Sequence, residues 1–101
     1  MRSVLAVDLG SSNLRAALVD ERGRLSYLQS IPAPTPSADA SGRSEIAANA
    51  WWDGFNACVS ALAASTGASF ENVAAVAISG VTRTQILLGA EQRPLRPAIL
   101  R

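Results

Sequence analysis

The chain has 101 residues, nearly half of them apolar, so one small domain with a packed core is expected rather than disorder. Its net charge is +1 and its nine basic residues are all arginines scattered along the chain, so a nucleic-acid surface is not indicated. With no histidine and one cysteine, a zinc site is not expected, and Ser-His-Asp or Cys-His catalysis within the chain is excluded. No apolar run approaches the ~20 residues of a membrane span. The lone cysteine suits a reducing compartment, so we expect a cytoplasmic protein without a membrane partner.

The first third of the chain predicts three strands joined by tight turns. Residues 3–9 form a short apolar run that ends before Gly10, and residues 14–20 form a second one. The sequence "DERG" then supplies turn chemistry. Residues 24–31 alternate less clearly, which places a third strand nearer the edge of the sheet.

A proline-rich loop over residues 32–43 separates these strands from a predicted helix. The helix begins near Ala48 and ends at Gly67, a C-cap candidate, and apolar residues recur at helical spacing at Trp51, Phe55, Val59 and Leu62. We expect Cys58 to lie in the core and the pair Trp51–Trp52 to pack there rather than line a ligand pocket.

Two further strands are predicted after the helix. Residues 72–80 form a continuous apolar run, typical of a strand covered on both faces, and residues 84–89 form a fifth strand. The expected order is therefore β-β-β-α-β-β, an α/β fold. Arg93 and Arg96 flank prolines and are expected on the surface.

The turn between the first two strands carries residues suited to phosphate. Glycine allows an anion close to the backbone, short side chains donate hydrogen bonds, and an arginine pairs with phosphate oxygens. A carboxylate is a ligand that Mg²⁺ prefers. The residues concerned are Asp8, Gly10, Ser11, Ser12, Asn13 and Arg15. Ordinary turn chemistry is the alternative, since Asp, Gly and Ser also favour turns. The pattern is neither a P-loop nor a dinucleotide-binding motif, because the chain has no lysine and a strand rather than a helix follows.

Four blocks of the sequence together resemble the FGGY carbohydrate kinases, within the actin-like ATPase superfamily. They are "AVDLGSSNLRAALVDERGRL", "SEIAANAWWDGFNACVSAL", "NVAAVAISG" and "LLGAEQRPLRPAIL", and they follow one another at matching spacing along the whole chain. The similarity is greatest to xylulokinase-like members. It implies a ribonuclease-H-like N-terminal domain, here incomplete, and ATP-dependent phosphorylation of a sugar or polyol hydroxyl.

The resemblance also implies roles for individual residues. Asp8 corresponds to the family's aspartate near Mg²⁺ and phosphate, residues 10–13 to the ATP phosphate loop, and Arg15 to an arginine of glycerol-kinase-like members. The segment 81–84 corresponds to the sugar-contact segment, so Thr82 and Arg83 are candidate substrate-binding residues. Xylulokinases typically have Gln-Met-His-Gly there and glycerol kinases Gln-Arg-Glu-Thr, so the identity of the sugar stays open. A solvated hairpin arginine is the alternative for Arg83.

Family members are several times longer than this chain. Residues 1–101 are expected to be the N-terminal part of the first domain, about a fifth of such an enzyme, with the general base and the adenosine-binding lobe beyond it. The isolated chain is therefore expected to be inactive. One alternative is a non-catalytic fragment that folds or associates, for example as a homodimer through exposed strand edges. Another is a different actin-like ATPase, which the Trp-Trp helix and the Arg-Pro-Ala-Ile ending disfavour.

Overall fold

The computed structural model describes residues 2–38, 44–81 and 84–100. Their elements, in chain order, are β1 (Ser3–Leu9), β2 (Asn13–Asp20), β3 (Leu25–Pro32), β4 (Ser37–Ala38), β5 (Ser44–Ile46), α1 (Ala48–Thr66), the 3₁₀ helix η1 (Gly67–Asn72), β6 (Val73–Gly80) and β7 (Ala98–Ile99). The predicted positions of the first three strands, the helix and the strand that follows it are confirmed.

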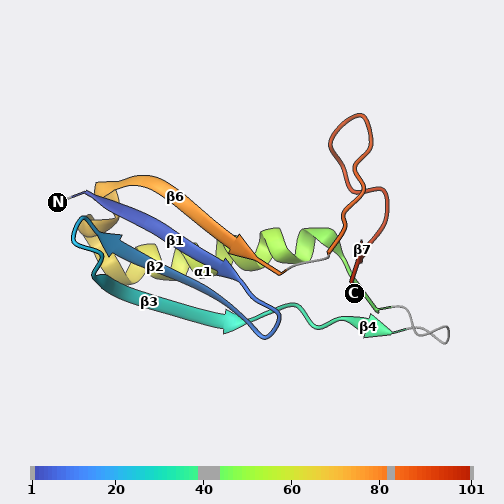
Figure 1. Ribbon diagram of the computed structural model, residues 1–101, viewed down its shortest axis with the longest axis horizontal. Helices are drawn as coiled ribbons and strands as arrows, with labels where there is room; N and C mark the ends of the chain where they lie inside the picture. The colour runs from blue at the N-terminus through green and yellow to red at the C-terminus, as the bar shows by residue number, and fades with distance from the viewer. Residues whose placement is uncertain (1, 39–43, 82–83, 101) are drawn as a thin grey trace.

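A four-stranded sheet in the order β3-β2-β1-β6 forms the centre of the molecule (Figure 1). β1, β2 and β3 form an antiparallel meander, and β6 returns to lie parallel to β1. After β3 the chain must cross from one edge of the sheet to the other to begin β6, and α1 makes most of that crossing. β3 lies at one edge, as its weak alternation indicates.

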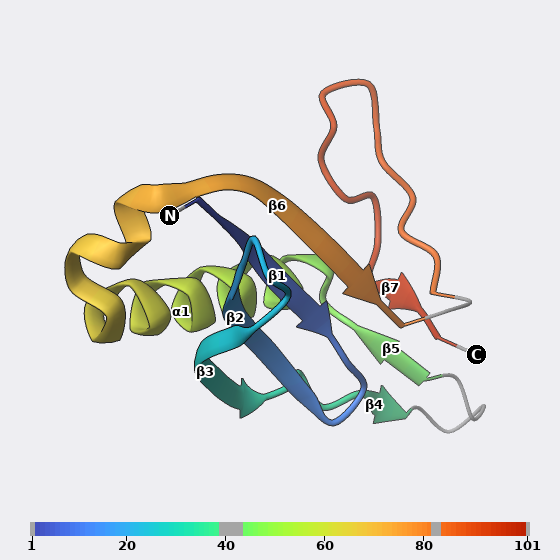
Figure 2. The ribbon, with the colours of Figure 1, turned by 60° about the vertical axis from the view of Figure 1, so that its left-hand side comes forward.

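Helix α1 covers one face of the meander, and the core lies between them (Figure 2). Leu5 and Val7 of β1 face Cys58 and Leu62 of the helix, and both helix residues are fully buried. The core position predicted for Cys58 is confirmed. At Gly54 the helix comes very close to the sheet, because an added Cβ would lie 2.5 Å from Leu14 Cδ1.

The ends of α1 follow the sequence signals. Ala47 at the N-cap makes no side-chain capping hydrogen bond, and Gly67 ends the helix with a φ of 59° and donates its N–H to the Ala63 carbonyl. Core packing of both tryptophans is wrong for Trp52, whose side chain is 61% exposed and stacks on Phe55. The two are neighbours in sequence and point about 100° apart on the helix, so Trp51 projects in nearly the same direction as Leu62, whereas Trp52 stacks on Phe55 from the exposed side.

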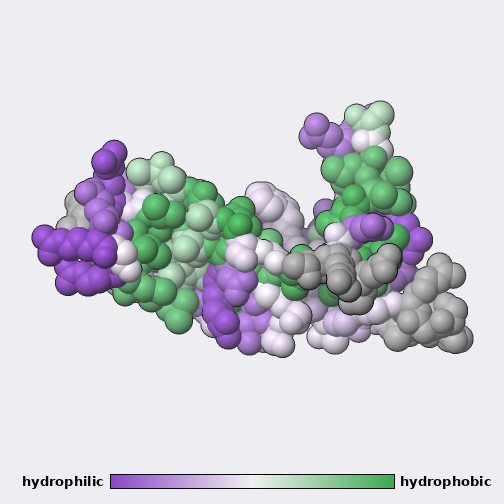
Figure 3. Space-filling view, viewed as in Figure 1, coloured by the Kyte–Doolittle hydropathy of each residue, from purple (hydrophilic) through white to green (hydrophobic). Residues whose placement is uncertain are grey.

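β6 is bare, so the prediction of a strand covered on both faces is wrong. Val76 and Ile78 are more than half exposed, and α1 packs on β1, β2 and β3 instead. The face of the sheet opposite α1 also carries apolar side chains in the open, and Figure 3 shows this green surface. An apolar strand is buried only where another element packs over its face. Within the described residues β6 also lies at the edge of the sheet, with β1 as its sole neighbour.

The predicted strand at 84–89 is also wrong. Within it only Gln85 and Leu88 form isolated bridges, to Ile99 and Pro94. The segment folds back on itself through a turn in which Gly89 donates its N–H to the Arg93 carbonyl. Prolines in the returning half lack the N–H groups that a regular ladder requires.

A second, three-stranded sheet ties this returning segment to the rest of the chain. Its order is β4-β5-β7, so β4 adds a short strand inside the predicted loop 32–43. The Arg96 guanidinium pairs with the Glu45 carboxylate of β5, and both side chains are partly buried. The surface position expected for Arg96 is therefore corrected, because this ion pair holds the residue against β5.

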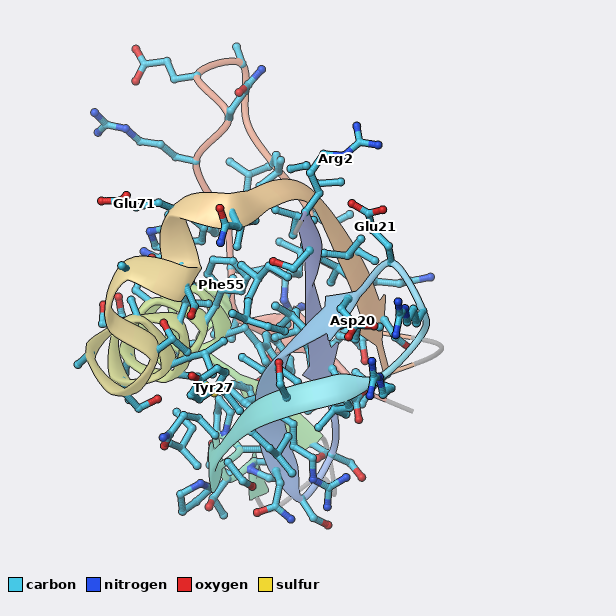
Figure 4. All side chains as sticks on the ribbon, turned by 90° about the vertical axis from the view of Figure 1, so that its left-hand side faces the viewer. Arg2, Asp20, Glu21, Tyr27, Phe55 and Glu71 are labelled. Carbon is cyan, nitrogen blue, oxygen red and sulfur yellow. The ribbon has the colours of Figure 1, made fainter. Side chains whose placement is uncertain are left out.

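The opposite end of the large sheet is polar, and Figure 4 looks onto it. Arg2 pairs with Glu21 at 3.6 Å, and the Asp20 carboxylate accepts hydrogen bonds from the backbone N–H groups of Arg22 and Arg24. Further along β3, Tyr27 takes a φ of 55° where the β2–β3 register shifts, which marks a bulge.

Candidate phosphate-loop site

The candidate site lies at the tip of the β1–β2 hairpin. Asp8 in β1 and Arg15 in β2 are antiparallel register partners, so their side chains project from the same face of the sheet. Asp8 is half-buried and Arg15 is exposed. On the other side of β1, Ser79 of β6 is the register partner of Asp8. The sheet therefore aligns Arg15, Asp8 and Ser79 in one polar row across three strands.

Ser79 is a member of this row that the sequence reasoning missed. It lies one residue before Gly80, inside an apolar run, so it resembles an ordinary small strand residue. The signal that could have found it is register, because a parallel strand ending at Gly80 and Leu9 places Ser79 beside Asp8.

The loop after Asp8 is closed by its own backbone. Gly10 donates its N–H to the Asn13 carbonyl at 3.0 Å, and an added Cβ on Gly10 would lie 2.6 Å from that same oxygen. The glycine thus makes room for the Asn13 carbonyl, and its N–H already has an acceptor within the loop. The Asp8 carboxylate is close by, since its Oδ2 would lie 3.8 Å from the same Cβ.

The two serines of the loop occupy its outer surface. Ser11 and Ser12 are exposed, and the Ser12 carbonyl accepts a hydrogen bond from Ala33 N–H at 3.0 Å, which ties the loop to the end of β3. Asn13 is half-buried where β2 begins. All of the predicted loop residues therefore lie together at one end of the sheet.

A hollow of about 400 Å³ lies on the open sheet face beside the polar row. Asp8, Arg15 and Ser79 line it together with small residues of the same strands, Ala6, Ala17 and Ala77. The alanines leave space above the strands, and the charged pair lies at the end of that space nearest the loop. The hollow therefore combines an apolar floor with a carboxylate and a guanidinium.

A smaller hollow of about 230 Å³ lies at the same end of the sheet and reaches the helix. It is lined by Leu9, Trp51, Gly80, Val81, Thr84 and Ile86. Val81 N–H donates to the Leu9 carbonyl at 3.2 Å, so the first residue of the predicted sugar segment lies against the end of β1. The candidates Thr82 and Arg83 lie outside the described residues.

Asp8 is a single carboxylate, and in the part of the chain that the structure describes no three His, Cys, Asp or Glu side chains gather to hold a metal. This donor set fits Mg²⁺, which binds through one or two carboxylates while phosphate oxygens and water complete its shell. It does not fit a cation that needs a cage of protein ligands.

Cys58 is not a candidate nucleophile. Burial raises the pKa of its thiol above the ordinary value, and the backbone hydrogen bond at Ala16 lowers it by less. A fully buried thiol with a raised pKa carries little thiolate at neutral pH.

No helix among the described residues is long and apolar enough to cross a membrane.

The fold consists of a mixed sheet, a crossover helix and a hairpin loop, the arrangement of the N-terminal domain of sugar kinases with the actin-like ATPase fold. The model of the FGGY family of carbohydrate kinases, N-terminal domain, matches residues 3–101. The chain belongs to the FGGY family of carbohydrate kinases.

Similar proteins agree with this assignment. Xylulose kinase of Escherichia coli K12 is 33% identical over 100 residues, which cover 95% of this chain and 19% of that protein. A solved xylulose kinase from Brucella ovis has a TM-score of 0.91 at 30% identity, over 98% of this chain and 21% of that one. The corresponding structure from Rhodospirillum rubrum has a TM-score of 0.86 at 28% identity, over 97% and 20%. The chain thus spans about a fifth of the length of these relatives.

Proposed function

We propose that residues 1–101 supply the phosphate loop and part of the sugar pocket of a kinase that transfers the terminal phosphoryl group of ATP to a hydroxyl of a sugar or polyol. Similarity to xylulose kinases favours a ketose such as xylulose. The observation that carries the proposal is the polar row Arg15–Asp8–Ser79 at the end of the hairpin, in a chain of this family.

Each residue has a role in the proposal. Arg15 pairs with phosphate oxygens, because a guanidinium donates two parallel hydrogen bonds to them. The hydroxyls of Ser11 and Ser12 donate to the same anion from the outer side of the loop. Asp8 is the residue that would hold Mg²⁺, which neutralises phosphate charge when bound. Thr82 and Arg83 remain the candidates that the sequence nominates for sugar contact.

Phosphoryl transfer depends on positioning and charge neutralisation, so a second lobe is needed to bring the nucleotide and a general base to this surface. The proposed kinase is cytoplasmic and needs ATP and Mg²⁺. It binds neither nucleic acid nor membrane.

The test measures ADP release from Mg-ATP with a panel of ketoses, aldoses and polyols, using a full-length kinase that contains residues 1–101. We expect sugar-dependent turnover, which Asp8→Asn lowers at least about 100-fold because a charge close to the transferring group is lost. We expect none from the pure 101-residue chain. A full-length kinase without sugar-dependent turnover would exclude the proposal.

The bare surface of β6 favours one second candidate, a non-catalytic module that associates through its strand edge. The side chains of Val76 and Ile78 are exposed on β6. Within the described residues β6 is also an edge strand, so one row of its backbone N–H and C=O groups has no strand partner. In that case the 101-residue chain forms a homodimer, and sedimentation shows a mass that rises with concentration. Asp or Lys in place of Val76 would abolish the association.

A further inference from the structure

The apolar stripe of α1 continues beyond the core. Leu62 and Cys58 are fully buried in it, Phe55 packs against the core in part, and Trp51 lies one turn nearer the helix N-terminus. Here the stripe passes the end of the sheet. Trp51 therefore has no complete cover of β-sheet residues and instead lines the hollow of about 230 Å³.

The walls of this hollow come from the carboxyl ends of two neighbouring parallel strands. Leu9 ends β1 and Gly80 ends β6, and in α/β sheets ligands bind outside such strand ends. The described walls are apolar except for Thr84. The volume is below the ~300–1,000 Å³ of pockets for larger ligands, which suits a small polyol better than a nucleotide.

Leu9 and Asp8 are consecutive residues of a strand, so they project from opposite faces. The hollow of Trp51 consequently lies on the helix side of β1, whereas the polar row lies on the open side. Both reach the same end of the sheet, so a ligand in the hollow and a phosphate at the loop would meet across the end of β1.

We propose that Trp51 is a specificity-determining residue for the acceptor sugar, with its indole ring packing against the C–H groups of the sugar backbone. This inference rests on the proposed sugar kinase function and deepens it. An aromatic face carries partial negative charge and attracts the partially positive C–H groups, and it cannot replace the hydrogen bonds of a phosphate. Trp51 therefore acts on sugar binding and leaves ATP binding unchanged.

The close approach of α1 at Gly54 supports this position. A side chain at residue 54 would collide with Leu14, so the glycine lets the first turns of the helix lie directly on β2. Trp51 is three residues earlier, almost one turn, and is held at the sheet end by that contact.

The experiment compares Trp51→Ala and Trp51→Phe with the matched pair Trp52→Ala and Trp52→Phe in a full-length kinase that contains this chain. Trp52 is the neighbouring indole, and it does not line the hollow. KM and kcat are measured for ATP and for sugars of three to six carbons, and thermal denaturation is recorded for each variant. We expect Trp51→Ala to raise the KM of the best sugar at least about 10-fold with the KM of ATP unchanged, because a filled apolar contact is lost. The sugar KM of Trp51→Phe should fall between those of the parent and Trp51→Ala, and both Trp52 variants should have the KM values of the parent.

An unchanged sugar KM in an active, folded Trp51→Ala enzyme overturns the inference and leaves the kinase assignment intact. Equal losses for ATP and sugar also overturn it, because they indicate a purely structural role. If Trp51→Ala does not fold, Trp51→Phe decides by the same comparison of the two KM values. A parent enzyme without sugar phosphorylation removes the proposed function, and the inference with it.

Discussion

Replacing Gly10 by alanine places a methyl group where the β1–β2 loop has no space for one. The new Cβ would lie 2.6 Å from the Asn13 carbonyl oxygen, and this neighbour is backbone rather than a side chain that could rotate away. To reach ordinary contact the two must separate by about 0.8 Å. The same carbonyl accepts the 3.0 Å hydrogen bond from Gly10 N–H, so that separation breaks the bond that closes the loop.

The size of the effect follows from these two losses. A backbone hydrogen bond contributes about 1 kcal/mol, and a strained loop backbone costs about 1–3 kcal/mol. If the loop must regain its shape to hold phosphate, roughly 2–4 kcal/mol is lost at the transition state, or about 30- to 1,000-fold in kcat/KM for ATP. Steady-state kinetics of a full-length kinase that contains residues 1–101, with varied ATP at saturating sugar, measure this loss directly.

Gly23→Ala is the matched control. Gly23 lies in the turn at the opposite end of the sheet, has a φ of 78° and has nothing within 4 Å of an added Cβ. Its alanine costs about 1–2 kcal/mol of stability through the left-handed backbone alone and should leave ATP kinetics unchanged. The reasoning is refuted if Gly10→Ala retains the parent kcat/KM for ATP, or if Gly10→Ala and Gly23→Ala lower that kcat/KM by the same factor.

Three further predictions concern the stability of the chain, each followed by urea denaturation. Leu62→Ala should cost about 2–5 kcal/mol, because Leu62 is fully buried between helix and sheet, and a smaller loss would mean that the core collapses around the site. Burial raises the pKa of Cys58 in the folded state above its unfolded value of 9.0, so the stabilisation that this group contributes is complete below pH 9 and decreases as pH rises towards the folded pKa. Cys58→Ala should therefore flatten the plot of unfolding free energy against pH above pH 9. An identical slope in the parent and the variant would contradict this. Arg96→Ala should cost about 1 kcal/mol or less, with the difference from the parent shrinking at 1 M salt, because its ion pair with Glu45 is only partly buried; a loss independent of salt would indicate packing instead.

The parts of the fold that the sequence predicts well are those in which the relevant information is local. The three strands of the meander are neighbours along the chain, and their apolar runs end at turn residues such as Gly10 and Gly23. The limits of α1 likewise follow from periodicity and from Gly67.

The parts that it missed depend on partners elsewhere in the chain. The apolar run of β6 indicates a strand but does not indicate whether another element packs over it. The run 84–89 has strand composition, yet the segment that returns beside it contains Pro94, which limits pairing to bridges. Trp52 belongs to an apolar pair, but the helix buries only one side.

The candidate site divides in the same way. Asp8, Gly10 and Arg15 lie within eight residues of one another, so their motif was visible in the sequence. Ser79 and Trp51 reach the same end of the sheet from distant segments, and no local pattern connects them to Asp8. The register of β1 with β6 places Ser79 beside Asp8, and the packing of α1 on the sheet places Trp51 at the same end.

The parallel pairing of β1 with β6 also determines the order in which the molecule can assemble. The meander can form as soon as residue 32 is available, whereas the other edge of β1 must wait for residues 73–80. At the usual pace of synthesis, roughly 5–20 residues per second, that interval lasts roughly 2–10 seconds. During this time β1 carries its core residues Leu5 and Val7 with one row of backbone groups unpaired. The last strand to arrive therefore ends the period in which a growing chain is most exposed to pairing with the wrong neighbour.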